Sequence, residues 1–202
     1  LTGQNLSGRN LANINWTGVN LSRATLTGTN LTGAKLANTK FSNANLQGAV
    51  LTRVSDADLV SATWTGADLT GQNLSGRNLA NIRLGGAILN GANLTGAVLT
   101  NATLDRAKLN KAILNAANLE GASLVGISDA DLASSTWESA NLTGQDFSTK
   151  ILSGINLAGA NLTRANLAAT DFSRANLKGA ILAGVGDADL KSSLWTSANL
   201  SG

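Results

Sequence analysis

Histidine, cysteine, tyrosine, methionine and proline are all absent from this chain of 202 residues. Without histidine, cysteine or tyrosine, the usual acid–base and nucleophilic groups of enzymes are missing. The absence of cysteine also excludes disulfides and thiolate metal sites. Aromatic residues make up 3% and charged residues 13% of the chain, whereas an average globular domain carries about 25% charged residues. We therefore expect no enzyme, no catalytic residue, no cofactor and no small-molecule substrate.

The chain also lacks the features of several other classes. Its 43% of hydrophobic residues excludes a disordered protein. It has no apolar run of about 18 residues, which a membrane span would need, and no signal peptide is visible. It begins and ends within a repeat and without an initiator methionine, so we expect a segment of a longer protein. An extracellular or envelope location is favoured over the cytoplasm, although the compartment stays open.

What the chain has is a large apolar residue at every fifth position. The register starts at Leu1, runs through Leu51, resumes at Leu59 and continues to Leu200, with every position Leu, Phe or Trp. Only Leu194 among the leucines lies off this register. These positions predict the core, which includes Trp16, Phe41, Trp64, Trp137, Phe147, Phe172, Trp195, Leu94 and Leu99.

A period of five fits neither a helix nor a regular strand, because their side chains repeat at 3.6 and 2 residues. It fits a chain that turns a corner every five residues, with one large and one small side chain pointing inward on each side. Four sides close a coil of about twenty residues, and coils stack at about 4.8 Å. Residues 1–202 then form one continuous solenoid of about ten coils, roughly 48 Å long.

The residues around each large position repeat the motif A-(N/D)-L-(S/T)-G, as at Ala92–Gly96. This pattern resembles that of the pentapeptide repeat family, and the resemblance covers essentially the whole chain. It implies an all-β fold, a right-handed quadrilateral β-helix. The resemblance says little about function, because one fold serves many functions.

Three-residue insertions break the register within residues 52–58, 125–131 and 183–189, each ending in Asp-Ala-Asp before a leucine. The insertions are separated by unequal lengths of chain, so we expect them not to project from one face. The stretch Leu1–Ile14 recurs unchanged as Leu69–Ile82, which indicates a longer repeating unit.

A basic residue stands at an inward position one coil after two of these insertions. A buried lone charge is costly, so we expect the insertion to bulge the coil and the basic residue to fill the opening against an aspartate. With a twenty-residue coil, Arg77 is expected over Ala57 and Lys150 over Ala130. The predicted structural plugs comprise Asp56, Asp58, Gln72 and Arg77, and Asp129, Asp131, Gln145 and Lys150.

The Asp-Ala-Asp pairs could in principle bind Ca²⁺, which takes six to eight oxygen ligands, but the calcium-binding nonapeptide repeat is absent. We interpret the pairs as structural and expect no metal site. Nucleic-acid binding would need clustered Lys/Arg or exposed aromatics, which the sequence does not indicate.

Three functions remain open. The first is a non-enzymatic structural or interaction protein, a rigid rod within a longer array or fibre, whose partner is a protein and possibly another copy. The second is a gyrase-binding DNA mimic, a role known in the family; it would need an acidic surface, whereas the net charge is +3. The third is an ice- or surface-binding solenoid that uses a threonine array.

Overall fold

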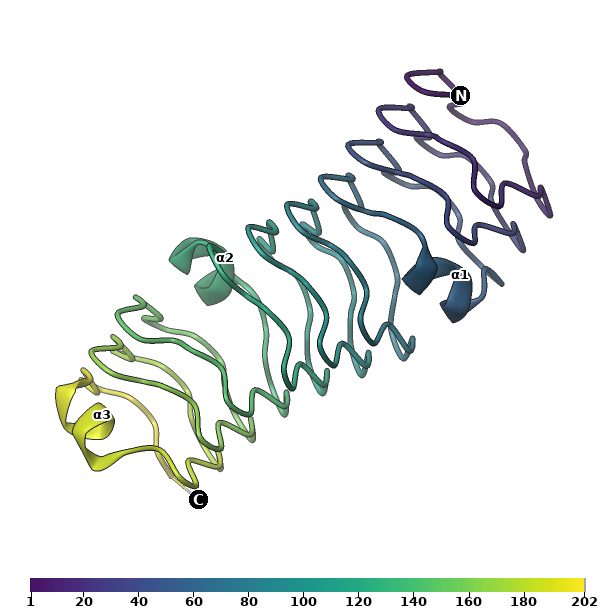
Figure 1. Cartoon of the computed structure of the whole chain (residues 1–202). Helices are drawn as coiled ribbons and strands as arrows, with labels where there is room; N and C mark the ends of the chain where they lie inside the picture. The colour runs from purple at the N-terminus through teal and green to yellow at the C-terminus, as the bar shows by residue number, and fades with distance from the viewer. Residues whose placement is uncertain (202) are drawn as a thin grey trace.

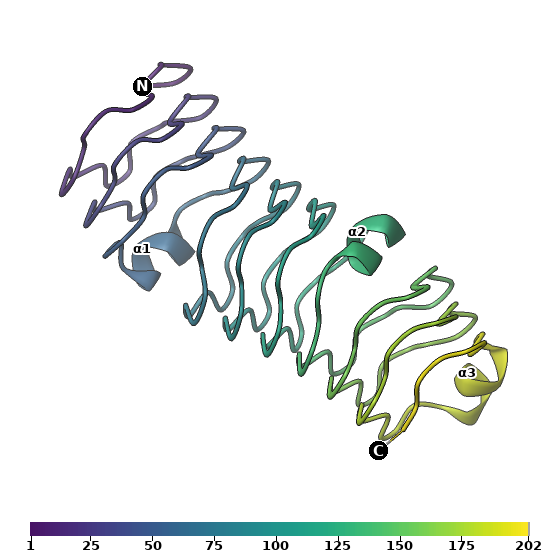
Figure 2. The ribbon, with the colours of Figure 1, turned by 180° about the vertical axis from the view of Figure 1, so that it is seen from behind.

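The computed structural model describes residues 1–201, which form a rod of stacked coils with the two termini at opposite ends (Figures 1 and 2). Parallel bridges join residues twenty positions apart, as between Asn93 and Ile113. At this bridge the Leu94 N–H donates to the Ile113 carbonyl at 2.8 Å, and the Ile113 N–H donates to the Ala92 carbonyl at 2.9 Å. The coil is thus twenty residues long where no insertion interrupts it.

The repeat motif explains how each corner forms. From Leu1 to Trp195, the second residue after each large centre adopts a positive φ except after Leu59, Leu132 and Leu190, for example Gly91 at 63° and Arg106 at 57°. Glycine reaches this region without strain. The asparagine before the centre supports the same turn, because Asn93 Oδ1 accepts the N–H of Thr95 at 3.0 Å. Since the chain turns every five residues, the bridges stay isolated and do not extend into long strands.

The inward residues form one continuous apolar core. Centres such as Leu94 and Leu99 are fully buried, and so are the small residues two positions earlier, such as Ala92 and Ala97. Of the predicted core, the structure buries Trp16, Phe41, Trp64, Trp137, Phe147, Phe172, Leu94 and Leu99. Trp195 is only partly buried against this core. It lies in the last described coil, which is covered on one side only.

The expectation of an all-β chain needs correction at the three insertions, which form short helices. They are α1 (Asp56–Ser61), α2 (Asp129–Ser134) and α3 (Asp187–Ser192). Each adds three residues to its coil, so the bridges that span an insertion join residues 23 apart, as between Ile113 and Thr136. The ladder resumes beyond every helix.

The helices project from different sides of the rod. Three coils and two further sides separate the centres Leu59 and Leu132, which places α1 and α2 on opposite sides, as Figures 1 and 2 show. Two coils and three sides separate Leu132 from Leu190, so α3 lies on a third side.

Candidate functional site

The coil ladder opens beside α1 and again beside α2, and we call these two places the first and second junctions. The first comprises residues 48–56 and 71–78 of adjacent coils, and the second comprises residues 121–129 and 144–151. Within residues 1–201, the Leu51 and Asn73 N–H groups donate no backbone hydrogen bond across the first junction. A helix is wider than the strand spacing of about 4.8 Å, so the coils on either side separate. Clefts of about 440 and 500 Å³ result.

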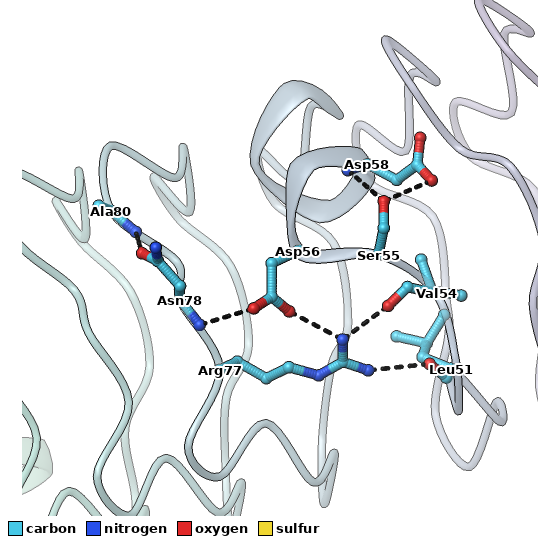
Figure 3. A network of polar contacts seen from close by, with 8 residues as sticks. All are labelled: Leu51, Val54, Ser55, Asp56, Asp58, Arg77, Asn78 and Ala80. Atoms are coloured by element: carbon cyan, nitrogen blue, oxygen red, sulfur yellow. Dashed lines mark hydrogen bonds and ion pairs between the residues drawn. The ribbon is translucent and has the colours of Figure 1, made fainter.

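An arginine crosses the first junction (Figure 3). Arg77 Nη1 donates to Asp56 Oδ1 at 2.8 Å and to the Val54 carbonyl at 2.6 Å, and Nη2 donates to the Leu51 carbonyl at 3.2 Å. The same carboxylate accepts the Asn78 N–H at 2.9 Å. The Arg77 side chain is 23% exposed, so its charge lies partly inside the coil and is neutralised there.

A glutamine crosses the same junction more deeply. Gln72 is buried, and its Nε2 donates to the carbonyls of Leu46 and Ala49, both at 2.9 Å. In an uninterrupted coil the carbonyl two residues before a centre, such as that of Ala92, accepts an N–H from the next coil. The Gln72 amide therefore replaces a lost backbone hydrogen bond.

The second junction repeats this arrangement with lysine in place of arginine. Lys150 Nζ lies 3.0 Å from Asp129 Oδ1 and donates to the Ile127 carbonyl at 3.1 Å. Asp129 Oδ2 accepts the Ile151 N–H at 2.9 Å. Gln145 Nε2 donates to the Leu119 and Ala122 carbonyls, both at 3.0 Å.

The aspartates at the junctions are ionised more readily than usual. Partial burial of Asp56 by itself raises its pKa, but the hydrogen bonds from Arg77 and the Asn78 N–H, with the Arg77 charge, outweigh burial and lower the pKa. For Asp129, burial again raises the pKa, and the Ile151 N–H and Lys150 lower it overall.

The stacking expected for the basic residues is wrong. Arg77 does not lie over Ala57, twenty residues earlier. It reaches the Val54 carbonyl, 23 residues earlier, because the three inserted residues lengthen the coil. Lys150 likewise reaches Ile127 and not Ala130.

In α1 and α2 the second aspartate of the pair bonds to the serine that caps the helix, and the ion pair to the basic residue is made by the first aspartate. The Asp58 N–H donates to Ser55 Oγ at 3.1 Å, and the Ser55 hydroxyl donates to Asp58 Oδ2 at 2.7 Å. Asp131 and Ser128 repeat these contacts at 3.0 and 2.6 Å. The signal for these helices was present in the sequence, because Ser-Asp-Ala-Asp has the spacing of a helix-capping motif.

The tryptophan after each insertion has a specific role that the sequence reasoning missed. Trp64 Nε1 donates to the Leu59 carbonyl within α1 at 2.7 Å, and Trp137 and Trp195 make the same bond to Leu132 and Leu190 at 2.9 Å. Trp64 also stacks on Phe41 with ring centroids 4.6 Å apart. The indole therefore joins each short helix to the core.

The chemistry available at the junctions is the pairing of charges and backbone groups. Among residues 1–201, no group of three or more His, Cys, Asp or Glu side chains could hold a metal ion. No helix in the same range is long and apolar enough to cross a membrane.

Among solved structures, the chain is similar to HetL, a pentapeptide repeat protein involved in heterocyst differentiation regulation from the cyanobacterium Nostoc sp. strain PCC 7120, at 29% identity and a TM-score of 0.41 over 98% of this chain and 87% of HetL. It is also similar to trypsin-treated QnrB1, a plasmid-mediated fluoroquinolone resistance protein, at 17% identity and a TM-score of 0.40 over 98% of this chain and 90% of QnrB1. A third is Rfr23 of the cyanobacterium Cyanothece 51142, at 25% identity and a TM-score of 0.27 over 64% of this chain and 88% of Rfr23.

No curated protein matches the chain. The family model for pentapeptide repeats matches it in eight copies, over residues 1–36, 29–55, 54–91, 78–115 and 151–185. These ranges cover well over half of the sequence and include the first junction. The chain is a member of the pentapeptide repeat family.

Proposed function

We propose that this chain is a non-enzymatic structural and interaction module, a stiff rod that belongs to a longer array. In this proposal the coil is a right-handed quadrilateral β-helix of about ten coils, as the family resemblance implies. Its partner is a protein, and an extracellular or envelope location is favoured.

The observation that carries the proposal is that other sides of the coil stay bridged at every insertion, although one side opens at each of the two junctions. Bridges between residues 23 apart join Lys40 to Thr63, Ile113 to Thr136 and Asp171 to Leu194. The core is continuous past α1 and α2 as well. A rod whose bridges and core continue past each insertion keeps its shape along its length, which suits a spacer or a scaffold.

The polar residues of the junctions support a structural role for the insertions. The cations of Arg77 and Lys150 are neutralised by Asp56 and Asp129, and their remaining hydrogen bonds go to backbone carbonyls. Groups that satisfy one another in this way are not poised for acid–base work, which needs a pKa close to the working pH. We infer that each insertion is a structural plug.

Small-angle X-ray scattering of the 202-residue chain, combined with negative-stain electron microscopy, tests the rod. We expect a stiff rod whose total length is about 48 Å, the length of ten stacked coils. A compact, near-spherical particle, or a rod that bends at the junctions, would overturn the proposal.

A gyrase supercoiling assay distinguishes the structural rod from the alternative function, a gyrase-binding DNA mimic. A DNA mimic has to present a strongly acidic surface, whereas this chain carries 15 basic and 12 acidic residues. We expect no inhibition of gyrase and no protection from gyrase inhibitors. Protection at stoichiometric concentration would replace our proposal with the DNA-mimic function.

A further inference from the structure

The cleft of the first junction is lined by backbone groups that lack the hydrogen bonds of a regular coil. Four of its lining residues are Leu51, Arg53, Asn73 and Ser75. Within residues 1–201, the Leu51, Arg53 and Asn73 N–H groups donate to no backbone carbonyl. No backbone N–H of the same range donates to the Asn73 or Ser75 carbonyl. One coil therefore presents two donors to the cleft, and the coil opposite presents two acceptors and a donor.

Residues 92–96, in an uninterrupted part of the rod, show how a strand bonds to the coils on both sides of it. They lie in the next coil, on the same side of the rod as the first junction. The Asn93 and Thr95 carbonyls accept N–H groups from the preceding coil. The Leu94 and Gly96 N–H groups donate to the following coil. The groups left open at the first junction are therefore those that a segment bonded like residues 92–96 would engage.

The cleft has the size of one extended strand. A helix is about 10 Å across, which is close to two strand spacings of about 4.8 Å each, so α1 holds the coils far enough apart for one further strand. A strand occupies about 4.8 Å by 10 Å by 3.3 Å per residue. The cleft of about 440 Å³ therefore holds about three extended residues, the length of one side of the coil without its corners.

The floor of the cleft limits the inward side chains of such a segment. Gln72 is buried there and donates to the Leu46 and Ala49 carbonyls of the coil opposite. The core cavity lined by Leu51, Leu74 and neighbouring centres measures only about 10 Å³. A large inward side chain would displace Gln72, so the inward residues of the segment have to be as small as alanine or glycine.

The charges at the cleft favour an acidic segment. Arg53 is exposed and makes no ion pair within residues 1–201. Among the described residues, none that lines this cleft is acidic. At the second junction the lining includes Asp146, and Gly126 takes the place of Arg53. Because opposite charges favour association, the first junction suits an acidic partner better than the second does.

We propose that the first junction binds an extended acidic segment of a partner protein as an additional strand between the two coils, a proposal that rests on the interaction role above. Carbonyls of the segment accept the Leu51, Arg53 and Asn73 N–H groups. Its own N–H groups donate to the Asn73 and Ser75 carbonyls, and an acidic side chain binds Arg53. The main-chain bonds provide affinity, and the small inward residues and the acid provide specificity.

A blocked peptide of sequence Ala-Val-Ala-Ser-Glu is the probe. Its alanines take the inward positions, its valine lies beside Val50, which is 42% exposed, and its glutamate lies near Arg53. Added peptide should slow hydrogen exchange at the Leu51, Arg53 and Asn73 amides, as measured by NMR. The Leu94 amide is the control, because it is already bonded to the next coil. Unchanged exchange at the three junction amides would overturn the proposal.

N-methyl groups on the peptide separate main-chain pairing from attraction by charge. Methylation of the central alanine removes the N–H that donates to the Asn73 carbonyl and should weaken binding about tenfold or more. Methylation of the serine is the matched control, because the Thr95 N–H at the corresponding place donates to Asn93 Oδ1. Equal binding by the two methylated peptides would show that the segment does not pair as a strand.

An arginine variant tests the acidic side chain. Arg53→Glu should weaken peptide binding about threefold to fivefold, the size expected for an exposed ion pair. Arg106→Glu is the matched control, since Arg106 is also an exposed corner arginine, with φ 57° against 60° for Arg53, and it should leave binding unchanged. Equal weakening by both variants would reduce the effect to net charge and contradict the contact with Arg53.

The second junction provides a comparison within the same molecule. The Leu124 and Gly126 N–H groups also donate to no backbone carbonyl within residues 1–201, but Asp146 lines that cleft. The glutamate peptide should therefore protect these two amides less than those of the first junction. Stronger protection at the second junction would contradict the selection by charge.

Failure of this inference is distinguishable from failure of the rod. A chain that scatters as a stiff rod and binds no peptide would overturn the strand contact alone. Sedimentation velocity with and without the peptide checks the identity of the partner. Self-association that the peptide abolishes would assign the cleft to a second copy of the chain and overturn the proposed partner.

Discussion

The uninterrupted coils and the two junctions join one coil to the next in different ways. Between residues 84 and 106 the backbone closes each coil on the next, with alternating leucine and alanine inside. At the junctions the backbone separates, and the side chains of Gln72 and Arg77, or Gln145 and Lys150, reach across. Side chains can thus replace the backbone hydrogen bonds between two coils locally, but a cleft then remains between those coils.

Stability is also distributed differently in the regular coils and at the junctions. In the regular coils many equivalent residues share the stabilisation, and each contacts its neighbours in the coils before and after. At a junction a few polar atoms carry it. Because repeat proteins are stabilised by interactions between neighbouring units, local defects need not unfold the whole rod. Chemical denaturation and hydrogen exchange can measure this difference.

The largest effect is expected in the regular coils. Leu94→Ala removes a fully buried side chain and should lower the free energy of unfolding by about 2–5 kcal/mol, as large-to-small core changes do. Leu1→Ala is the matched control, since Leu1 lies on the same register but is 53% exposed; it should cost less than about 1 kcal/mol. Equal losses at the two sites would show that the core is not the main source of stability.

A smaller effect is expected at the buried amide of the first junction. Gln72→Leu keeps the volume but leaves the Leu46 and Ala49 carbonyls without the Gln72 donor, which should cost about 1–3 kcal/mol. Hydrogen exchange should accelerate in the coils that flank α1 and not near Leu94. Gln47→Leu changes an exposed glutamine and should be nearly neutral. A neutral Gln72→Leu variant would mean that the amide is dispensable.

The ion pair of the first junction should contribute less to the free energy of unfolding than the Gln72 amide does. A double-mutant cycle with Arg77→Met and Asp56→Asn should give a coupling energy of about 0.2–1 kcal/mol, since both groups are partly exposed. The same cycle at Lys150 and Asp129 should give a coupling that is no larger, because lysine cannot reproduce the forked contacts of arginine. A larger coupling at the lysine junction would reverse this comparison.

The smallest effect is expected from pH. The pKa values of Asp56 and Asp129 are lowered in the folded state, so these groups stabilise the fold fully above their unfolded pKa. Their contribution is lost as pH falls from about 4 through the lowered folded pKa. The melting temperature should therefore fall over this acidic range. A chain with Asp56→Asn and Asp129→Asn should show a shallower fall, and an unchanged slope would assign the effect to other carboxylates.

The sequence predicted the regular coils well, because their signal repeats at every centre. Leu94 and Leu99 lie where a period of five places them, fully buried. Partners across the coil followed from the same period, so long as the coil had twenty residues. The prediction that Arg77 lies over Ala57 was wrong because that period was carried through an insertion that lengthens the coil to 23 residues.

The helices were missed for a different physical reason. Asp-Ala-Asp was interpreted as a bulge carrying a pair of acids, although the preceding Ser55 and Ser128 provide helix caps. Six-residue helices are unstable alone, so the capping motif does not suffice for a helix here, and tertiary contacts such as the indole bonds from Trp64 and Trp137 stabilise it. No local feature of the sequence indicates that the indole five residues after the leucine will donate a hydrogen bond to the helix.

The three helices also determine how a partner can approach. Since α1 and α2 point in opposite directions and α3 in a third, a flat surface laid against the rod can touch only one of them. A partner that recognises two helices at once has to wrap around the rod. Flat partners bound to different helices would lie on different sides of the rod. The uneven spacing of the insertions therefore distributes the three helices around the axis as well as along it.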